Sequence, residues 1–501
     1  MIDGILLGLQ TVLTLHNLAL VLAGCAAGTF IGMLPGLGPI SAIALMIPVT
    51  YGFNPASGMI LLAGVYYGAI FGGSTSSILI NAPGVAGTVA TAFDGYPLSQ
   101  QGKAGKALAV AAYASFAGGT IAAIFLVLAA PFLAELSLSF RSADYFVLML
   151  LGLALVAAFS NKGDYLKAIL MTIVGLMLST VGTDLSAGVQ RFTFGRMDLI
   201  DGISFLLLAM ATFALAEAFM MVLKPASTAK TQIPAYRDLA LSRDDVKRIV
   251  PSVCRSSILG FFVGTLPGAG ATIASFLAYG MERNLVKPQE SAQFGKGSLA
   301  GLAAPEAANN AACTGSFVPL LTLGIPGSGT TAILLGALIA YGVQPGPRLF
   351  IDAPEVFWSV IVSMYFGNII LLVLNLPLIP QIARLLLLPR PLLVPLIMFF
   401  SIMGVYLVSF NSFDIQLMLL IAVAAVILRL LAFPMAPLLL GFILGGMLED
   451  NLRRAMTLSD GSWAFLWDRP LTMGLVIITL LVIASPIFRA LFTQKQLRVQ
   501  T

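Results

Sequence analysis

One eleven-residue stretch occurs twice in the chain, and it decides the architecture. Gly28-Thr-Phe-Ile-Gly-Met-Leu-Pro-Gly-Leu-Gly38 matches Gly260-Phe-Phe-Val-Gly-Thr-Leu-Pro-Gly-Ala-Gly270 at seven of eleven positions, and the offset is 232 residues. Each copy places proline and glycine inside an apolar run, where proline removes an N–H and glycine loosens the backbone. An internal repeat of this kind indicates a chain built from two related halves.

A second, weaker pair follows the first pair in each half. Asn81-Ala-Pro-Gly-Val-Ala-Gly-Thr88 aligns with Gly324-Ile-Pro-Gly-Ser-Gly-Thr-Thr331, with Pro83 on Pro326 and an offset of 243 residues. The same two breaks therefore recur in the same order. We predict a first membrane repeat over 1–223 with breaks near 35–38 and 81–88, a linker over 224–250, and a second repeat over 251–501 with breaks near 267–270 and 324–331.

The composition requires a lipid environment. Of 501 residues, 58% are hydrophobic and 10% are charged, and the mean hydropathy is +0.97. A soluble domain carries roughly 25% charge, so this chain has too few charged residues to cover a water-facing surface. The apolar runs are continuous, whereas barrel strands alternate. We expect an all-α polytopic membrane protein of about 12 transmembrane helices plus re-entrant or broken helices.

The distribution of basic residues predicts on which side of the membrane the linker lies. The net charge is only +5, and the basic residues gather in the polar segment from Lys224 to Arg255. Positive residues concentrate in cytoplasmic loops, so we expect this segment in the cytoplasm and no nucleic-acid partner.

The paired breaks predict a transport site. An unpaired backbone group in hydrocarbon costs several kcal/mol, so a break is tolerated where it is buried in protein or lines a wet cavity. Corresponding breaks in two halves are typical of the substrate site of a secondary transporter. Half-helix ends offer N–H dipoles to anions and carbonyls to cations. Ordinary Pro-Gly loops between helices are the alternative. We expect substrate binding by Pro35, Gly36, Leu37, Gly38, Ser76, Asn81, Pro83, Gly84, Thr88, Pro267, Gly268, Ala269, Gly270, Pro326, Gly327, Ser328, Gly329, Thr330 and Thr331.

Polar residues beside the breaks are candidates for ion coupling. Neutral oxygen and amide groups suit Na⁺, although small polar residues are also routine packing residues in membranes. An acid at membrane depth is a functional candidate by default; the alternative for Glu306 is a helix start in water. We expect ion coupling by Glu306, Asn309, Asn310 and Thr314, and we expect Asp94, Lys103 and Lys106 in loops.

Motifs for catalysis are lacking. The sequence has no His-Glu-x-x-His, no Walker lysine loop and no cysteine cluster, and His16 is its single histidine. We therefore expect no enzyme activity and no cofactor, with transport driven by a gradient of Na⁺ or H⁺. A channel-like protein or a structural membrane scaffold is the alternative, although neither explains two matched sets of breaks.

Longer motifs identify a family. The chain closely resembles the large membrane subunit of tripartite tricarboxylate transporters over nearly its whole length and in motif order, through Gly32-Met-Leu-Pro-Gly-Leu-Gly-Pro39, Tyr67-Gly-Ala-Ile-Phe-Gly-Gly-Ser-Thr-Ser-Ser-Ile-Leu-Ile-Asn-Ala-Pro-Gly84, Phe93-Asp-Gly-Tyr-Pro97, Ala304-Pro-Glu-Ala-Ala-Asn-Asn-Ala311 and Thr322-Leu-Gly-Ile-Pro-Gly327. The resemblance implies a permease of the bacterial inner membrane that works with a small membrane subunit of about four helices. It also implies a periplasmic solute-binding protein that delivers a carboxylate such as citrate, with uptake coupled to cations, Na⁺ above all.

The same resemblance favours inverted repeats and an elevator-like movement of the broken-helix domain against a scaffold. Inversion requires an odd number of crossings between equivalent points of the repeats. If the linker and the C-terminal tail are both cytoplasmic, the second half crosses an even number of times. At least one helix would then lie outside the repeat. The particular carboxylate and the oligomeric state stay open.

Overall fold

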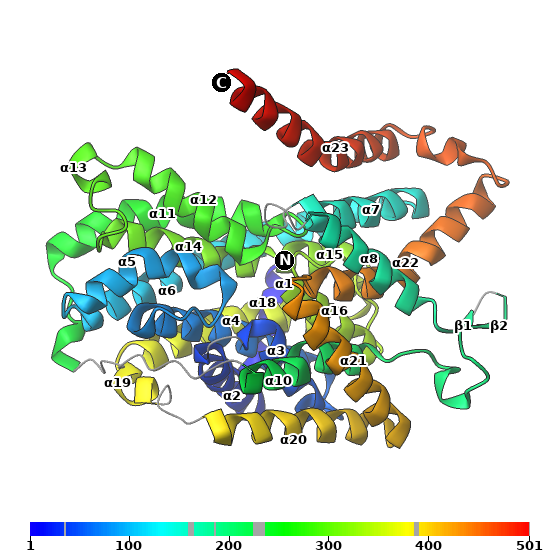
Figure 1. Cartoon of the computed structure of the whole chain (residues 1–501), viewed down its shortest axis with the longest axis horizontal. Coiled ribbons are helices and arrows are strands. Elements are labelled where there is room, and N and C mark those ends of the chain that lie inside the picture. Colours follow the sequence, from blue (N-terminus) through cyan, green and yellow to red (C-terminus); the bar gives the residue numbers. More distant parts are fainter. Residues whose placement is uncertain (35–36, 159–164, 185–186, 224–235, 385–389, 500–501) are drawn as a thin grey trace. The chain divides into compact units, whose positions relative to one another are not determined.

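Helices make up nearly all of the structure. The computed structural model describes residues 1–34, 37–158, 165–184, 187–223, 236–384 and 390–499 (Figure 1). It contains two compact units. The large unit comprises Met1–Ala134 and Leu206–Val426, and the small unit comprises Glu135–Phe205 and Ile427–Thr501. Each unit therefore contains chain from both predicted repeats.

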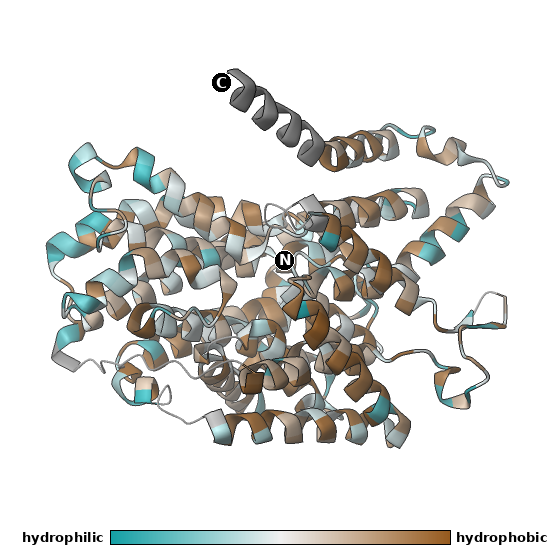
Figure 2. Cartoon of the chain, in the orientation of Figure 1, coloured by the Kyte–Doolittle hydropathy of each residue, from teal (hydrophilic) through white to brown (hydrophobic). Residues whose placement is uncertain are grey.

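Seven described helical segments are long and apolar enough to cross a membrane. They are α2 (Leu15–Met33), α4 (Pro55–Ile80), α6 (Ala104–Ser137), Phe205–Leu223, α18 (Pro354–Asn375), α20 (Arg390–Ser409) and α21 (Ser412–Leu430). Figure 2 shows α20 as hydrophobic along its length. Shorter apolar helices accompany them, so the prediction of an all-α polytopic membrane protein is confirmed.

The other described helices of the large unit are mostly shorter, although α11 has 23 residues. They are α1 (Ile2–Val12), α3 (Gly38–Met46), η1 (Ile47–Thr50), η2 (Ala86–Thr88), α5 (Val89–Gln100), the π-helical η4 (Met210–Leu215) between α9 (Phe205–Ala209) and α10 (Ala216–Leu223), η5 (Tyr236–Leu239), α11 (Arg243–Thr265), α12 (Gly270–Leu285), α13 (Pro288–Ser291), α14 (Leu299–Gly315), α15 (Phe317–Leu323), α16 (Gly329–Ala340), α17 (Leu349–Asp352) and α19 (Ile379–Ile382).

Glycine allows two equivalent helix pairs to pack closely. A Cβ on Gly28 of α2 would clash with the carbonyl oxygen of Val65 on α4, and a Cβ on Gly260 of α11 would clash with that of Ala308 on α14. The glycines are 232 residues apart and their partners are 243 apart, which are the offsets of the two repeated motifs. One turn further on, the same relation links Gly32 with Ala69 and Gly264 with Ala312. The duplication is therefore present in the helix contacts as well as in the sequence.

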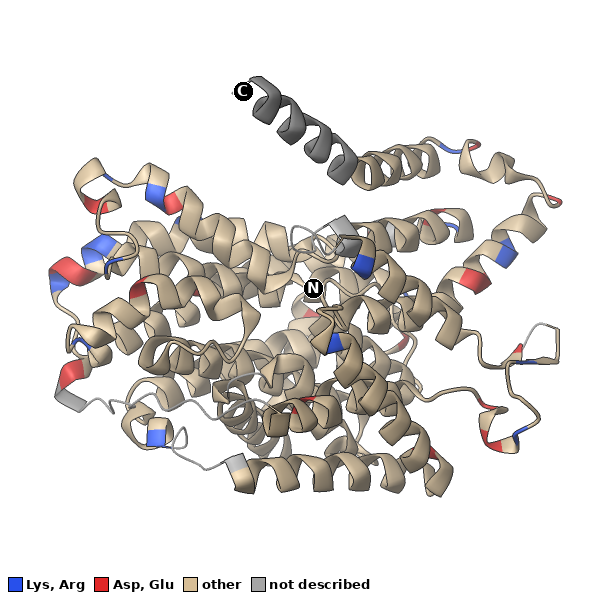
Figure 3. Ribbon diagram, viewed as in Figure 1, with Lys and Arg blue, Asp and Glu red and all other residues tan. Residues whose placement is uncertain are grey.

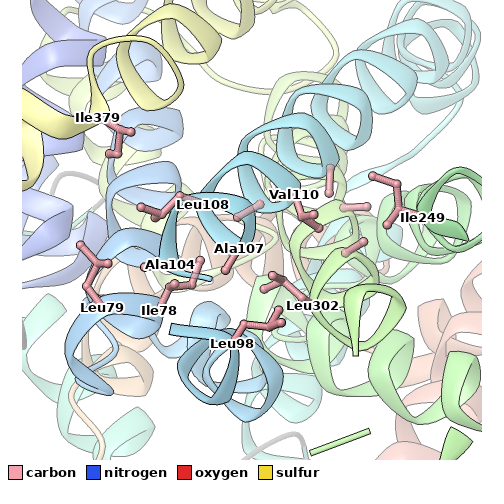
Figure 4. Close-up of a cluster of buried hydrophobic side chains, with 14 of the residues drawn as sticks. Ile78, Leu79, Leu98, Ala104, Ala107, Leu108, Val110, Ile249, Leu302 and Ile379 are labelled. Carbon is pink, nitrogen blue, oxygen red and sulfur yellow. The ribbon is translucent and has the colours of Figure 1, made fainter. Parts of the chain in front are cut away.

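A buried apolar cluster joins the two halves of the sequence. Ile78, Leu79, Leu98 and Leu108 of the first half pack with Leu302 of the second (Figure 4). All five are at most 3% exposed. Between membrane helices such contacts act through van der Waals packing, so this cluster holds α4, α5 and α6 against α11 and α14.

The charged residues of the large unit gather around α13 and the adjoining ends of α11 and α12 (Figure 3). α11 begins at Arg243, inside the predicted linker, because Ser242 and Asp245 form a capping box there. Lys106 Nζ lies 2.8 Å from Asp245 Oδ2. Burial raises the pKa of Asp245, but hydrogen bonds from Lys106 and Ser242 outweigh this effect and lower the pKa to about 2.

The small unit contains four longer helices and a hairpin. Its elements are α7 (Ser142–Ala158), α8 (Tyr165–Ser179), β1 (Gly182–Asp184), β2 (Val189–Arg191), η3 (Met197–Leu199), α22 (Ala436–Leu458), η7 (Trp463–Leu466) and α23 (Pro470–Val499). β1 and β2 are antiparallel, with Thr183 opposite Gln190. Arg191 Nη1 lies 2.8 Å from Glu449 Oε1, so an ion pair fixes the hairpin to α22.

Candidate substrate and ion site

Helices stop and restart at all four predicted breaks. α2 ends at Met33 and α3 begins at Gly38, while α11 ends at Thr265 and α12 begins at Gly270. Gly38 has φ +61° and Gly270 has φ +59°, a left-handed conformation that favours glycine at both equivalent positions. The second breaks separate α4 from α5 and α15 from α16. Pro35 and Gly36 lie outside the described residues.

Contacts link the breaks to one another inside the large unit. Gly268 N–H donates to the carbonyl oxygen of Gly327 over 3.0 Å, which ties the first break of the second half to its second break. Asn309 Nδ2 donates to Gly87 O over 3.3 Å and so connects the two halves. A Cβ on Gly84 would clash with Gly32 O, so this loop passes directly against α2. A Cβ added to Gly38 would lie 3.8 Å from Gly84 O, and one added to Gly87 would lie 3.2 Å from the Cβ of Ala271, so the breaks of the two halves adjoin. We call these four adjoining breaks the break cluster.

Two half-helices in the break cluster start without a side-chain cap. The N-cap residues are Leu37 for α3 and Ala269 for α12, and neither side chain can accept a hydrogen bond. α16 differs, because Ser328 Oγ accepts from Thr331 N–H over 3.2 Å in a capping box. The first turns of α3 and α12 therefore keep N–H groups and a positive dipole end that suit a carboxylate.

Burial divides the predicted substrate residues into two groups. Seven are at least partly exposed: Gly38, Asn81, Pro83, Pro267, Gly268, Ser328 and Gly329. Ten are buried: Leu37, Ser76, Gly84, Thr88, Ala269, Gly270, Pro326, Gly327, Thr330 and Thr331. The exposed group is mostly glycine and proline, so a ligand at this surface would meet backbone more than side chains.

Buried hydroxyls hold the first-half loop in place. Thr88 Oγ1 accepts from Ser77 Oγ over 2.8 Å and donates to Val85 O over 2.9 Å. Ser76 Oγ donates to Gly73 O over 3.1 Å within α4. The bonds of Thr88 position the loop, and direct contact of Ser76 or Thr88 with substrate stays a prediction.

Glu306 lies in the middle of α14 and is 0% exposed. The alternative of a helix start in water is therefore wrong, because α14 begins at Leu299 behind the Ser298 cap. The carboxylate accepts hydroxyl bonds from Ser74 over 2.7 Å, from Ser115 over 2.8 Å, and from Thr91. Sequence reasoning missed Thr91 and Ser115 because α5 and α6 approach Glu306 only in the folded chain.

The other predicted ion-coupling residues form a polar row along α14. Asn310 Nδ2 donates to Asn309 Oδ1 over 2.7 Å, and Thr314 Oγ1 donates to Asn310 O over 3.4 Å. Asn310 Oδ1 is buried without a hydrogen-bond partner. All three residues are at most 1% exposed. A role in coupling stays a prediction for each of them.

Asp94 is not a loop residue, and that expectation was wrong. It lies inside α5 and is 0% exposed. Its Oδ1 accepts from the N–H groups of Gly295, Gly297 and Ser298 over 2.7–2.9 Å, and its Oδ2 accepts from Tyr279 over 3.0 Å. Asp94 thus fixes the start of α14 to α5.

Both nearby lysines were expected in loops, and the structure agrees for only one of them. Lys106 also lies in a helix, α6, whereas Lys103 lies between α5 and α6 as expected.

A larger cleft lies away from the break cluster. It has a volume of about 510 Å³ and is lined by residues of α11, α12 and α13, including Lys247, Arg248, Arg255 and Lys287. Arg255 pairs with the buried Glu282, with Nε 2.7 Å from Oε1. None of the predicted break residues lines this cleft. We call it the basic cleft, and it is a rival location for an anionic substrate.

Among the described residues, no three His, Cys, Asp or Glu side chains lie close enough together to hold a metal ion. Cys25 and Cys313 are buried and Cys254 is exposed, and all three are free. Ser328 caps α16.

Comparison with known proteins agrees with the motifs. The profile of the Tripartite tricarboxylate transporter TctA family matches residues 18–440. A 52.8 kDa protein of Agrobacterium vitis, described as uncharacterized and encoded in the TAR-I ttuC' 3' region, is 43% identical over 480 residues, which cover 96% of this chain and 95% of the relative. A second A. vitis protein, from the TAR-II ttuC' 3' region, is 42% identical over 231 residues, which cover 45% of this chain and 95% of the relative. No solved structure matches. The chain belongs to the Tripartite tricarboxylate transporter TctA family.

Proposed function

We propose that the chain is the permease subunit of an ion-coupled secondary transporter. It imports tricarboxylates or related carboxylates across the bacterial inner membrane. A periplasmic solute-binding protein delivers the substrate, and a small membrane subunit completes the transporter. Na⁺ is the proposed coupling ion, with H⁺ as the alternative.

The observation that carries this proposal is the duplicated break cluster. Equivalent half-helices start at Gly38 and Gly270 in the same left-handed conformation. Their uncapped first turns suit carboxylate groups, since N–H donors and the helix dipole both favour negative charge there. Two such ends in one unit match a substrate that carries more than one carboxylate.

The proposal includes the movement by which substrate crosses. We infer inverted repeats and an elevator-like displacement of the broken helices, because matched breaks in two halves are typical of alternating-access transporters. A pore has no need for such matched breaks. The rival reading as a channel or scaffold is therefore weaker, and transport measurements separate the two.

Reconstitution tests the proposal. Proteoliposomes containing this chain and the small membrane subunit, with the binding protein added outside, are given a panel of labelled di- and tricarboxylates. With an inward Na⁺ gradient we expect at least one carboxylate to accumulate above its external concentration. Accumulation should collapse when the gradient is dissipated. A channel would equilibrate the label without accumulation, and no gradient-dependent uptake across the panel would refute the permease.

The same assay discriminates between the two candidate substrate locations. Lys247→Ala combined with Arg248→Ala removes two positive charges from the basic cleft. If substrate binds at the break cluster, the double variant keeps the KM of the wild type. A KM raised tenfold or more would move the substrate site to the basic cleft.

A further inference from the structure

The carboxylate of Glu306 is buried without a positive partner. Glu306 is 0% exposed, and no Lys, Arg or His nitrogen of the described residues lies within 4.0 Å of it. Burying an unpaired carboxylate is costly. The hydroxyls of Ser74, Thr91 and Ser115 supply hydrogen bonds but no charge. This position therefore favours either a proton or a bound cation.

A small cavity lies beside two of the serines that bond to this carboxylate. Its volume is about 10 Å³, and Ser74, Thr75, Ser115 and Asn375 line it together with the apolar Phe71, Leu108, Ala111 and Ala112. Ser74 and Ser115 are the residues whose hydroxyls reach Glu306 Oε2. A space of this size holds about one water-sized particle. It accommodates a dehydrated monovalent ion and excludes a carboxylate substrate.

Asn375 brings an unused oxygen to the cavity. The residue is 4% exposed, and its Nδ2 donates to Leu371 O over 3.0 Å. Its Oδ1 is buried and has no hydrogen-bond partner. Leaving such an acceptor unsatisfied costs about 1–3 kcal/mol. A cation or a hydrogen-bond donor in the cavity would satisfy this amide oxygen.

The hydroxyls have the right polarity for a cation. Ser74 Oγ is 2.7 Å from Glu306 Oε2 and 3.3 Å from Ile70 O, so the carboxylate takes its single proton. Ser115 likewise gives its proton to Glu306. A hydroxyl oxygen that has donated its proton keeps its lone pairs for another partner. Hard cations take such oxygen ligands.

We propose that this cavity is a Na⁺ site. The ion is held by the hydroxyl oxygens of Ser74, Thr75 and Ser115 and by Asn375 Oδ1, and the nearby charge of Glu306 balances it. The single negative charge of Glu306 balances the single positive charge of Na⁺, and the other oxygen ligands are neutral. The ligands come from α4, α6 and α18 and the charge from α14, so the ion links helices of both predicted repeats.

Of the ion-coupling residues predicted from the sequence, this site uses Glu306. None of the residues that line this cavity belongs to the break cluster. Its role in coupling rests on the proposed function, whereas its binding of Na⁺ does not.

Binding of ²²Na⁺ to the purified full chain in detergent tests the site directly, without substrate or partner subunits. We expect saturable binding that unlabelled Na⁺ displaces and that K⁺ and choline do not. Asn375→Ala and Glu306→Gln should each weaken binding at least tenfold. Ser363→Ala is the matched control, because Ser363 is a buried hydroxyl on α18 that bonds to Val360 O outside the cavity. It should bind as the wild type does.

A variant that fails to fold is recognised by gel filtration, and Asn375→Asp then replaces Asn375→Ala. This variant keeps an oxygen and adds a charge, so it should retain Na⁺ binding. Absence of displaceable ²²Na⁺ binding would mean that the cavity holds only a water molecule, and unchanged affinity in Asn375→Ala and Glu306→Gln would place the ion elsewhere. Either result overturns the site. Na⁺ binding without carboxylate uptake would keep the site and remove the proposed function.

Discussion

At the scale of single residues, glycine at position 268 has a conformation that other residues rarely adopt. Its φ is +83°, and its N–H donates to Gly327 O. A left-handed backbone costs an ordinary residue about 1–2 kcal/mol, and a β-branched side chain is less tolerant still. Pro267 and Gly268 are partly exposed, so the strain falls on the proposed binding surface.

We expect Gly268→Val to reduce uptake by the reconstituted transporter at least tenfold while the protein still inserts and elutes as a folded species. Gly280→Ala is the control, because Gly280 follows on α12 with nothing within 4 Å of an added Cβ. It should transport normally. Wild-type uptake kinetics in Gly268→Val would remove this loop from the site. The equivalent change at Gly36 concerns a residue outside those described.

Asp94 is a second residue whose loss has a calculable effect. Replacing it with alanine removes the acceptor for three backbone N–H groups and the Tyr279 hydroxyl. Each buried group left unsatisfied costs about 1–3 kcal/mol. We expect the Tm, followed by tryptophan fluorescence in detergent, to fall in the order wild type, Asp94→Asn, Asp94→Ala. Tyr279→Phe should lower the Tm less than Asp94→Ala does, because it removes only one of these hydrogen bonds. An unchanged Tm in Asp94→Ala would contradict the role of Asp94 in holding the start of α14.

At the scale of elements, close glycine packing makes α11 and α14 behave as one structural piece. A Cβ on Gly260 would clash with Ala308 O. Overpacking of this kind costs about 1–3 kcal/mol, whereas alanine is intrinsically better than glycine in a helix. Gly260→Ala should therefore lower the Tm, while Gly280→Ala should leave it unchanged or raise it. Equal stability of the two variants would mean that the helices can separate without penalty.

The elements also show what sequence patterns can predict. Proline and glycine punctuation located all four breaks, because these residues act on the local backbone. Hydropathy identified long helices such as α4 and α18 for the same local reason. Partners brought together by folding were not predictable: Ser115 reaches Glu306 across 191 positions of sequence, and Asp94 bonds to Ser298 across 204. Phe93-Asp-Gly-Tyr-Pro97 has the composition of a turn, but it lies inside α5. Its aspartate, Asp94, accepts hydrogen bonds from N–H groups at the start of α14.

At the scale of the whole molecule, the sequence repeats and the compact units are different divisions of the chain. The large unit combines residues of both repeats and contains all the described parts of the breaks. It also contains the proposed Na⁺ site. The proposed substrate and Na⁺ sites therefore both lie in the large unit, which combines one pair of breaks from each half.

The carboxylate substrate of the proposed permease should bind at the break cluster, and protection of an introduced cysteine by substrate measures this. Ala86 is small and exposed within the second break, so it is the position for a reporter cysteine. Ala86→Cys is made in a Cys254→Ser background, since Cys25 and Cys313 are buried. The rate of maleimide labelling is measured with and without the carboxylate that accumulates most strongly in the uptake panel.

Lys247→Cys in the basic cleft provides the reference position for the same measurement. Saturating substrate should slow labelling at position 86 several-fold and leave labelling at position 247 unchanged. Labelling at position 86 that ignores the substrate, with protection at position 247 instead, would contradict binding at the break cluster.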